Sequence, residues 1–137
     1  MTLPAKLTAA RARSLRMRES DLQGYVMDLL RFRGVPGLIY FHPANESKRS
    51  PRTGAFLKRM GMLPGVADVV VITPGGIAHF LELKTPTGKA SMAQIAFATA
   101  CAANGSDYWL AKTPEEAEAA LTTWGALRQP VQARRAA

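Results

Sequence analysis

The stretch from Gly65 to Gln94, GVADVVVITPGGIAHFLELKTPTGKASMAQ, decides the fold of this chain. Two apolar runs, Val66–Thr73 and Ile77–Lys84, flank a Pro-Gly-Gly sequence at residues 74–76. Pro-Gly-Gly is a strong turn signal, and runs of this length on either side of it are typical of strands. We therefore expect an antiparallel hairpin at the centre of the fold.

Charged residues stand inside these two runs, where a buried hairpin should have none. Asp68 lies in the first run, and Glu82 and Lys84 lie at the end of the second. If residues 74–76 form a three-residue loop, Asp68 stands opposite Glu82, with Cβ atoms about 5 Å apart on one face of the sheet. Alternation along the strand puts Lys84 on that face and Leu83 on the other.

Two carboxylates this close repel each other unless a positive group lies between them. Hard oxygen ligands suit Mg²⁺ or Mn²⁺, and Lys84 could orient or deprotonate a water molecule, or stabilise charge on a phosphate. The pattern therefore predicts a metal-dependent phosphodiesterase. A competing interpretation makes Asp68 a cap at the start of its strand and Glu82 with Lys84 an ion pair at the rim. The strand is apolar on both faces up to Leu81, which favours a site at the edge of the sheet.

Hydrophobic spacing, caps and breakers predict the other elements. They are a helix over Ser20–Arg33, a strand over Leu38–Phe41, a possible helical turn over Thr53–Met60, a helix over Ser91–Ala103, a strand over Asp107–Ala111 and a helix over Pro114–Trp124. The order α-β-β-β-α-β-α predicts an α/β fold with one mixed sheet flanked by helices. We expect a basic arm at 1–17, a single domain at 18–124, and a frayed tail at 125–137.

The net charge of +8 is concentrated in the first 60 residues, which hold twelve Lys or Arg and four Asp or Glu. This asymmetry favours a polyanionic partner such as a nucleic acid, although it could serve solubility alone. Residues 43–64 form a long connection that we expect to contact substrate, with a purely solvated loop as the alternative. Its basic residues are Lys48, Arg49, Arg52, Lys58 and Arg59.

The expected location is cytoplasmic, in a bacterial or phage-encoded intracellular protein. No run approaches the ~18 apolar residues of a membrane span, and no apolar segment of a secretory signal is present. The single cysteine, Cys101, forms no internal disulfide. The first eighteen residues are rich in Arg and lack acids, so organellar targeting stays open. His42 and His79 are too isolated in the sequence to indicate a zinc site.

Three segments together resemble one known family: PGVAD at 64–68, HFLELK at 79–84 and TPTGKASMAQ at 85–94. The chain resembles the VRR-NUC family of the PD-(D/E)xK nuclease superfamily over about residues 18–112. The family also tends to place a Glu and a Gln four residues apart on its first helix, matched by Glu19 and Gln23. The resemblance implies a restriction-endonuclease-like core.

The resemblance further implies a set of site residues. Asp68, Glu82 and the backbone carbonyl of Leu83 would hold Mg²⁺ or Mn²⁺, and Lys84 would be the catalytic lysine. Gln94 would join the site from the start of its helix.

Two of the implied roles have competing explanations. Gln94 could instead complete a capping box with Ser91. Glu19 would add a carboxylate from the first helix, but Ser20 next to it could cap that helix with Gln23 in the third position.

The activity implied is that of an endonuclease that hydrolyses phosphodiester bonds in DNA. By resemblance to Holliday-junction resolvases of DNA repair and recombination, we expect a homodimer selective for branched DNA such as four-way junctions or flaps. Lys89, Asn45 and His42 could reach phosphate, or each could be a loop or turn residue. The alternatives are a non-catalytic nucleic-acid-binding module and a nuclease subunit of a larger repair or phage replication assembly.

Overall fold

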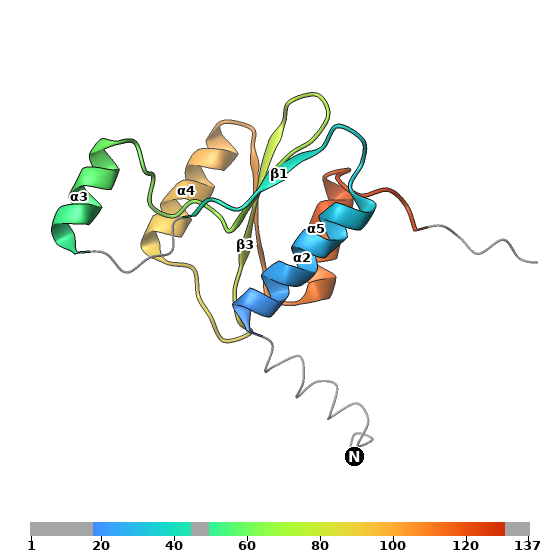
Figure 1. Ribbon diagram of the computed structural model, residues 1–137, viewed down its shortest axis with the longest axis horizontal. Helices are drawn as coiled ribbons and strands as arrows, with labels where there is room; N and C mark the ends of the chain where they lie inside the picture. Colours follow the sequence, from blue (N-terminus) through green and yellow to red (C-terminus); the bar gives the residue numbers. More distant parts are fainter. Residues whose placement is uncertain (1–17, 45–49, 131–137) are drawn as a thin grey trace, which may run out of the picture.

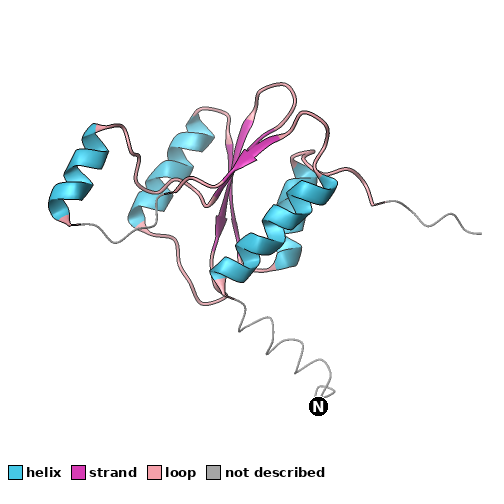
Figure 2. Cartoon of the chain, in the orientation of Figure 1, coloured by secondary structure: helices cyan, strands magenta, loops and turns pink. Residues whose placement is uncertain are grey.

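The computed structural model describes residues 18–44 and 50–130, which form a four-stranded mixed sheet with helices on both faces (Figures 1 and 2). The helices are α2 (Glu19–Arg33), α3 (Pro51–Arg59), α4 (Met92–Ala103) and α5 (Pro114–Thr123). The strands are β1 (Ile39–Phe41), β2 (Val69–Ile72), β3 (Ala78–Leu83) and β4 (Asp107–Ala111). The predicted α/β architecture is confirmed, with α3 added between β1 and β2.

The strands follow the order β1-β2-β3-β4 across the sheet. The first two pairs are antiparallel, and β3 pairs with β4 in parallel, connected by α4. The predicted hairpin register is confirmed, because Val69 stands opposite Leu81 and the Thr73 N–H donates to the Ile77 carbonyl at 3.1 Å. Gly75 makes the turn possible with a φ of +104°, a conformation that side chains disfavour.

The apolar core lies between the sheet and the helix pair α2 and α5. Leu81 and Leu83 of β3 point to this side and are almost completely buried. Helix α2 contributes Leu22, Val26 and Leu30, spaced four residues apart on one face. On the other side of the sheet, Phe80 meets Phe97 of α4 edge to face, with ring centroids 4.9 Å apart. The alternation of β3 thus separates the core from the second face.

The prediction that the chain frays from residue 125 is wrong for the first residues after α5. Ala126 and Leu127 are buried in the core. The Val35 N–H donates to the Ala126 carbonyl at 2.9 Å, and the Arg128 N–H donates to the Arg33 carbonyl at 2.7 Å. This short segment therefore closes the end of the core beside α2. It is too short to show any hydrophobic period, which is why the sequence pattern missed it.

Helix α2 begins one residue earlier than predicted, and Ser20 does not cap it. The N-cap is Arg18, whose backbone N–H donates to the Asp21 carboxylate at 3.3 Å. The capping role proposed for Ser20 with Gln23 is wrong, since both residues lie within the helix.

Helix α3 confirms and lengthens the helical turn predicted in the connection before β2. It starts at Pro51 and is capped by Ser50, whose hydroxyl accepts from the Thr53 N–H at 3.2 Å. It buries none of its residues and stands apart from the sheet (Figure 1). Within residues 18–44 and 50–130, no helix is both long and apolar enough to cross a membrane.

Candidate active site

A cleft of about 420 Å³ opens where the loop before β2, the end of β3 and the start of α4 meet. Its lining includes Asp68, Glu82, Ser91 and Gln94, and α3 adds Gly54 and Lys58 along one side. The structure therefore brings the two predicted carboxylates into one cleft.

Asp68 precedes β2 by one residue and is attached to the neighbouring strand. Its Oδ2 accepts a hydrogen bond from the Leu83 backbone N–H at 2.9 Å. Its own carbonyl oxygen lies 2.5 Å from Nδ1 of His42, which follows β1. These two contacts hold Asp68 beside Leu83, the residue that follows Glu82. This position agrees with the predicted hairpin register. The bond to Leu83 also gives Asp68 a structural role at the start of the strand.

Glu82 is a buried carboxylate, with 3% of its surface exposed. Its Oε1 accepts from the Gln94 side-chain amide at 2.6 Å and lies 3.5 Å from Nζ of Lys84. Burial and the negative charge of Asp68 raise the pKa of Glu82, Lys84 opposes them, and the net result is a shift from 4.5 to about 7. A carboxylate with such a pKa is only partly ionised near neutral pH, and additional positive charge would favour its ionised form.

Gln94 forms the capping box and also contacts Glu82, so its position fits both of the alternatives that the sequence left open. Its side-chain oxygen accepts from the Ser91 backbone N–H at 2.9 Å, and the Ser91 hydroxyl accepts from the Gln94 N–H at 3.2 Å. This is a complete capping box at the start of α4. The amide nitrogen of the same side chain then donates to Glu82. The helix cap thus holds the amide in place for the carboxylate.

Gly65 keeps the loop before Asp68 in contact with α4. Its φ is +83°, and a Cβ atom at this position would lie 2.3 Å from the Ala93 carbonyl oxygen and 2.8 Å from the Gln94 nitrogen. Only glycine allows this close approach. The Pro-Gly that precedes Asp68 in the sequence therefore has a physical function, which is to place the loop of Asp68 against the helix of Gln94.

The remaining predicted residues differ in whether they line this cleft. Glu19 is exposed at the first position of α2, and its side chain makes no hydrogen bond or ion pair with the rest of the described chain. Lys58 lines the cleft, whereas Arg52, Arg59 and Lys89 are exposed. Lys48, Arg49 and Asn45 lie outside the described residues.

Tyr108 is a residue near the site that the sequence did not reveal. It pairs with Phe80 across the parallel strands, and its hydroxyl is buried with no hydrogen-bond partner among the described atoms. Burial raises the pKa of Tyr108, with further contributions from the charges of Glu82 and Asp68. Its position depends on the crossover through α4, which no local pattern in β4 indicates.

His79 lies in the core. Its ring stacks on Trp124 with centroids 4.9 Å apart, and its two nitrogens lie 3.1 Å from Thr73 Oγ1 and from Asp107 Oδ2. In the part of the chain that the structure describes, no group of three or more His, Cys, Asp or Glu gathers at one point to hold a metal.

Comparisons with known proteins identify the fold. A search of solved structures finds a "VRR_NUC domain protein" with a TM-score of 0.63 and 21% sequence identity, covering 79% of this chain and 88% of that chain. A second structure, "VRR_NUC domain", has a TM-score of 0.54 and 16% identity over 77% of this chain and 96% of that chain. No protein-family model and no curated protein matches the sequence. The chain therefore has the fold of VRR_NUC domain structures.

Proposed function

We propose, from this shared fold, that the chain is a VRR-NUC deoxyribonuclease that depends on Mg²⁺ or Mn²⁺. The observation that carries the proposal is the pairing of Asp68 with a buried Glu82 in one cleft, with Lys84 beside it. Placing a second acid beside a buried carboxylate costs stability, so this arrangement favours a role in chemistry over a role in folding.

The donor set fits a hard divalent cation. Asp68 and Glu82 supply carboxylate oxygens, and the Leu83 backbone carbonyl is the proposed third ligand. Mg²⁺ commonly binds one or two carboxylates and keeps several waters, so two acids are enough. A cation between them would remove the repulsion that, together with burial, raises the pKa of Glu82. When bound, it would polarise the scissile phosphate and favour ionisation of a water nucleophile.

The protein's own groups would position the substrate and the nucleophile. The Lys84 ammonium, 3.5 Å from Glu82, can donate to a phosphate oxygen or to the attacking water. Gln94 orients the Glu82 carboxylate through its amide. Glu19, at the start of α2, is proposed as an additional carboxylate that acts once DNA is bound.

The proposed substrate is DNA, in particular branched DNA such as a four-way junction or a flap. Lys58 in the cleft and the exposed Arg52, Arg59 and Lys89 would contact phosphates. The described domain has limited surface for holding a duplex, so we propose a homodimer that presents two clefts to one branched substrate.

A cleavage assay tests the proposal. Labelled linear, flapped and four-way-junction DNA would be incubated with wild type, Asp68→Asn and Lys84→Ala in Mg²⁺ or Mn²⁺. We expect both variants to lose cleavage by about 10²–10³-fold while still binding DNA. Asp28→Asn, an exposed acid on α2, is the matched control and should cut like the wild type.

Two outcomes would contradict the proposal in different ways. Normal cutting by both variants would show that the site assignment is wrong. Binding without cutting by the wild type, on every substrate and with both metals, would indicate a non-catalytic DNA-binding module. Sedimentation over a range of concentrations tests the homodimer, which a monomer throughout would exclude.

A further inference from the structure

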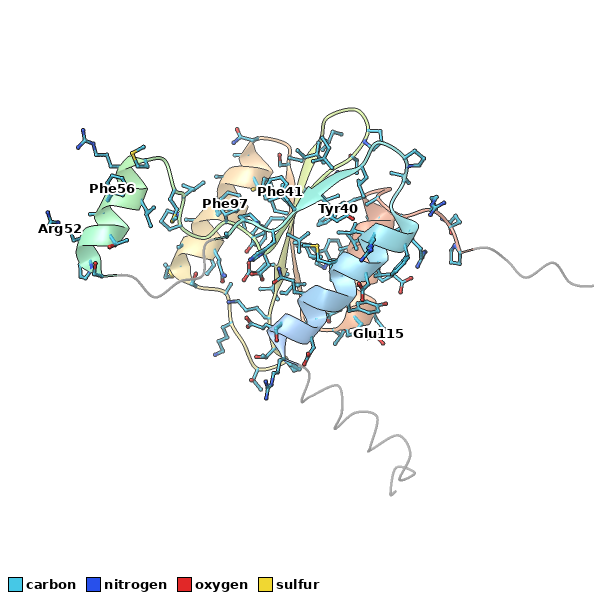
Figure 3. All side chains as sticks on the ribbon, in the orientation of Figure 1. Tyr40, Phe41, Arg52, Phe56, Phe97 and Glu115 are labelled. Carbon is cyan, nitrogen blue, oxygen red and sulfur yellow. The ribbon has the colours of Figure 1, made fainter. Side chains whose placement is uncertain are left out.

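Helix α3 differs from the other helices because it contributes nothing to the core. None of its nine residues is buried, and it carries the bases Arg52, Lys58 and Arg59 without any acid. Figure 3 shows it apart from the sheet, with Arg52 and Phe56 labelled on it. It is nevertheless a well-formed helix, with Pro51 in its first turn and Ser50 as its cap. Its position therefore needs an explanation other than packing.

The helix has two distinct faces. Gly54 and Lys58, four residues apart, line the cleft. Arg52, Phe56 and Arg59 follow the i, i+4, i+7 spacing of a single helix face. With about 100° of rotation per residue, Phe56 lies roughly 200° around the axis from Lys58. The second face therefore points away from the cleft.

This outer face combines an aromatic ring with charge on both sides. Phe56 is 60% exposed, with an arginine one turn before it and another one turn after it, and Met60 at the end of the helix is 68% exposed. Single exposed apolar residues are common and mean little alone. A protein partner that covered Phe56 would also have to supply acceptors for the two guanidinium groups. A nucleic acid complements all three groups, because phosphates pair with arginine and a base stacks on the ring.

We propose that α3 is a wedge that recognises an opened base stack. Phe56 stacks on the base exposed at a branch point, and Arg52 and Arg59 contact the phosphates of the two flanking strands. Lys58, on the inner face, contacts the strand that enters the cleft. The inference rests on the proposed function for its DNA partner. It goes beyond that function by assigning the preference for branched DNA to Phe56.

Binding measurements without cleavage test this assignment. Fluorescence anisotropy in EDTA would compare a fluorescein-labelled four-way junction with a linear duplex of the same arm sequence. We expect Phe56→Ala to weaken junction binding about tenfold while linear duplex binding changes less than twofold. Phe56→Trp should retain junction binding. Phe56→Leu should behave like Phe56→Ala, since leucine is apolar but has no aromatic face.

The matched control is Phe32→Ala on α2, a phenylalanine with 67% exposure that should leave both affinities unchanged. Equal loss on junction and duplex, or wild-type behaviour of Phe56→Leu, would overturn the stacking role. Sedimentation showing that Phe56→Ala converts a dimer to a monomer would assign this face to a protein contact instead. Because EDTA prevents metal-dependent cutting, a failure of the nuclease proposal would appear only in the cleavage assay.

Discussion

The sheet face toward α2 and α5 is closed and apolar, whereas the face toward α4 opens into the cleft that contains Asp68 and Glu82. Both faces use the same strand. Leu81 and Leu83 of β3 enter the core, and Glu82 between them enters the cleft. The alternation of one strand thus divides the residues that stabilise the fold from those that we propose act on DNA. Substitutions on the core face should mainly lower stability, whereas substitutions in the cleft should mainly lower cleavage.

The largest effect on stability is expected on the core face. Leu81→Ala removes a fully buried side chain and should lower the free energy of unfolding by about 3 kcal/mol. Cleavage per folded molecule should stay close to that of the wild type, because Leu81 does not line the cleft. Chemical denaturation and a cleavage assay below the transition measure the two quantities. Loss of cleavage in fully folded Leu81→Ala would show that the two faces are not separable.

Glu82→Gln should do the reverse of Leu81→Ala: in metal-free protein it should raise stability, and it should abolish cleavage. The pKa of Glu82 is about 7 in the folded chain against an ordinary 4.5, so folding takes up a proton between these values. The wild type should therefore lose stability as pH rises from about 4.5 through 7. Above pH 7, Glu82→Gln should be more stable than the wild type by up to about 3 kcal/mol, yet inactive. Denaturation in EDTA at pH 5 and pH 8 tests this, and a variant less stable at pH 8 would contradict it.

The contact between Gly65 and α4 gives a smaller effect with a close control. Gly65→Ala should lower the free energy of unfolding by about 2 kcal/mol and reduce cleavage, because its Cβ would meet the Ala93 carbonyl. Gly37→Ala has almost the same backbone, with a φ of +82° against +83°, but has open space around it. The difference between the two variants isolates the contact. Equal losses would mean that backbone conformation alone matters at residue 65.

Two variants at the start of α4 have the smallest expected effects. They distinguish the capping of this helix from the contact of Gln94 with Glu82. Ser91→Ala removes the cap but leaves the bond between Gln94 and Glu82, and should cost about 1 kcal/mol with cleavage within twofold of the wild type. Gln94→Ala keeps the bond to the Ser91 hydroxyl but removes the side-chain half of the capping box and the bond to Glu82, and should reduce cleavage about tenfold. Thermal denaturation and initial cleavage rates distinguish them. If the two variants cut equally well, Gln94 acts only as a cap.

Much of the sheet could be predicted because the signals are local. The three-residue turn at 74–76 fixes the hairpin register, and β4 has the bounds expected from its apolar run. Contacts between distant segments could not be predicted in this way. Tyr108 approaches Glu82 only through the parallel crossover, and Leu127 is buried only because the chain returns to α2. The sequence left the role of Gln94 open, because a capping motif does not show that the same side-chain amide also contacts Glu82.

The central claim is that Asp68 and Glu82 together hold a divalent cation. Isothermal titration of metal-free protein with Mn²⁺ tests it most directly, in the wild type, Asp68→Asn and Glu82→Gln, at pH 6 and pH 8. We expect one Mn²⁺ per chain in the wild type, bound more tightly at pH 8 because Glu82 must lose its proton, and at least tenfold weaker binding in each variant. Equal Mn²⁺ affinity in all three proteins would contradict the account.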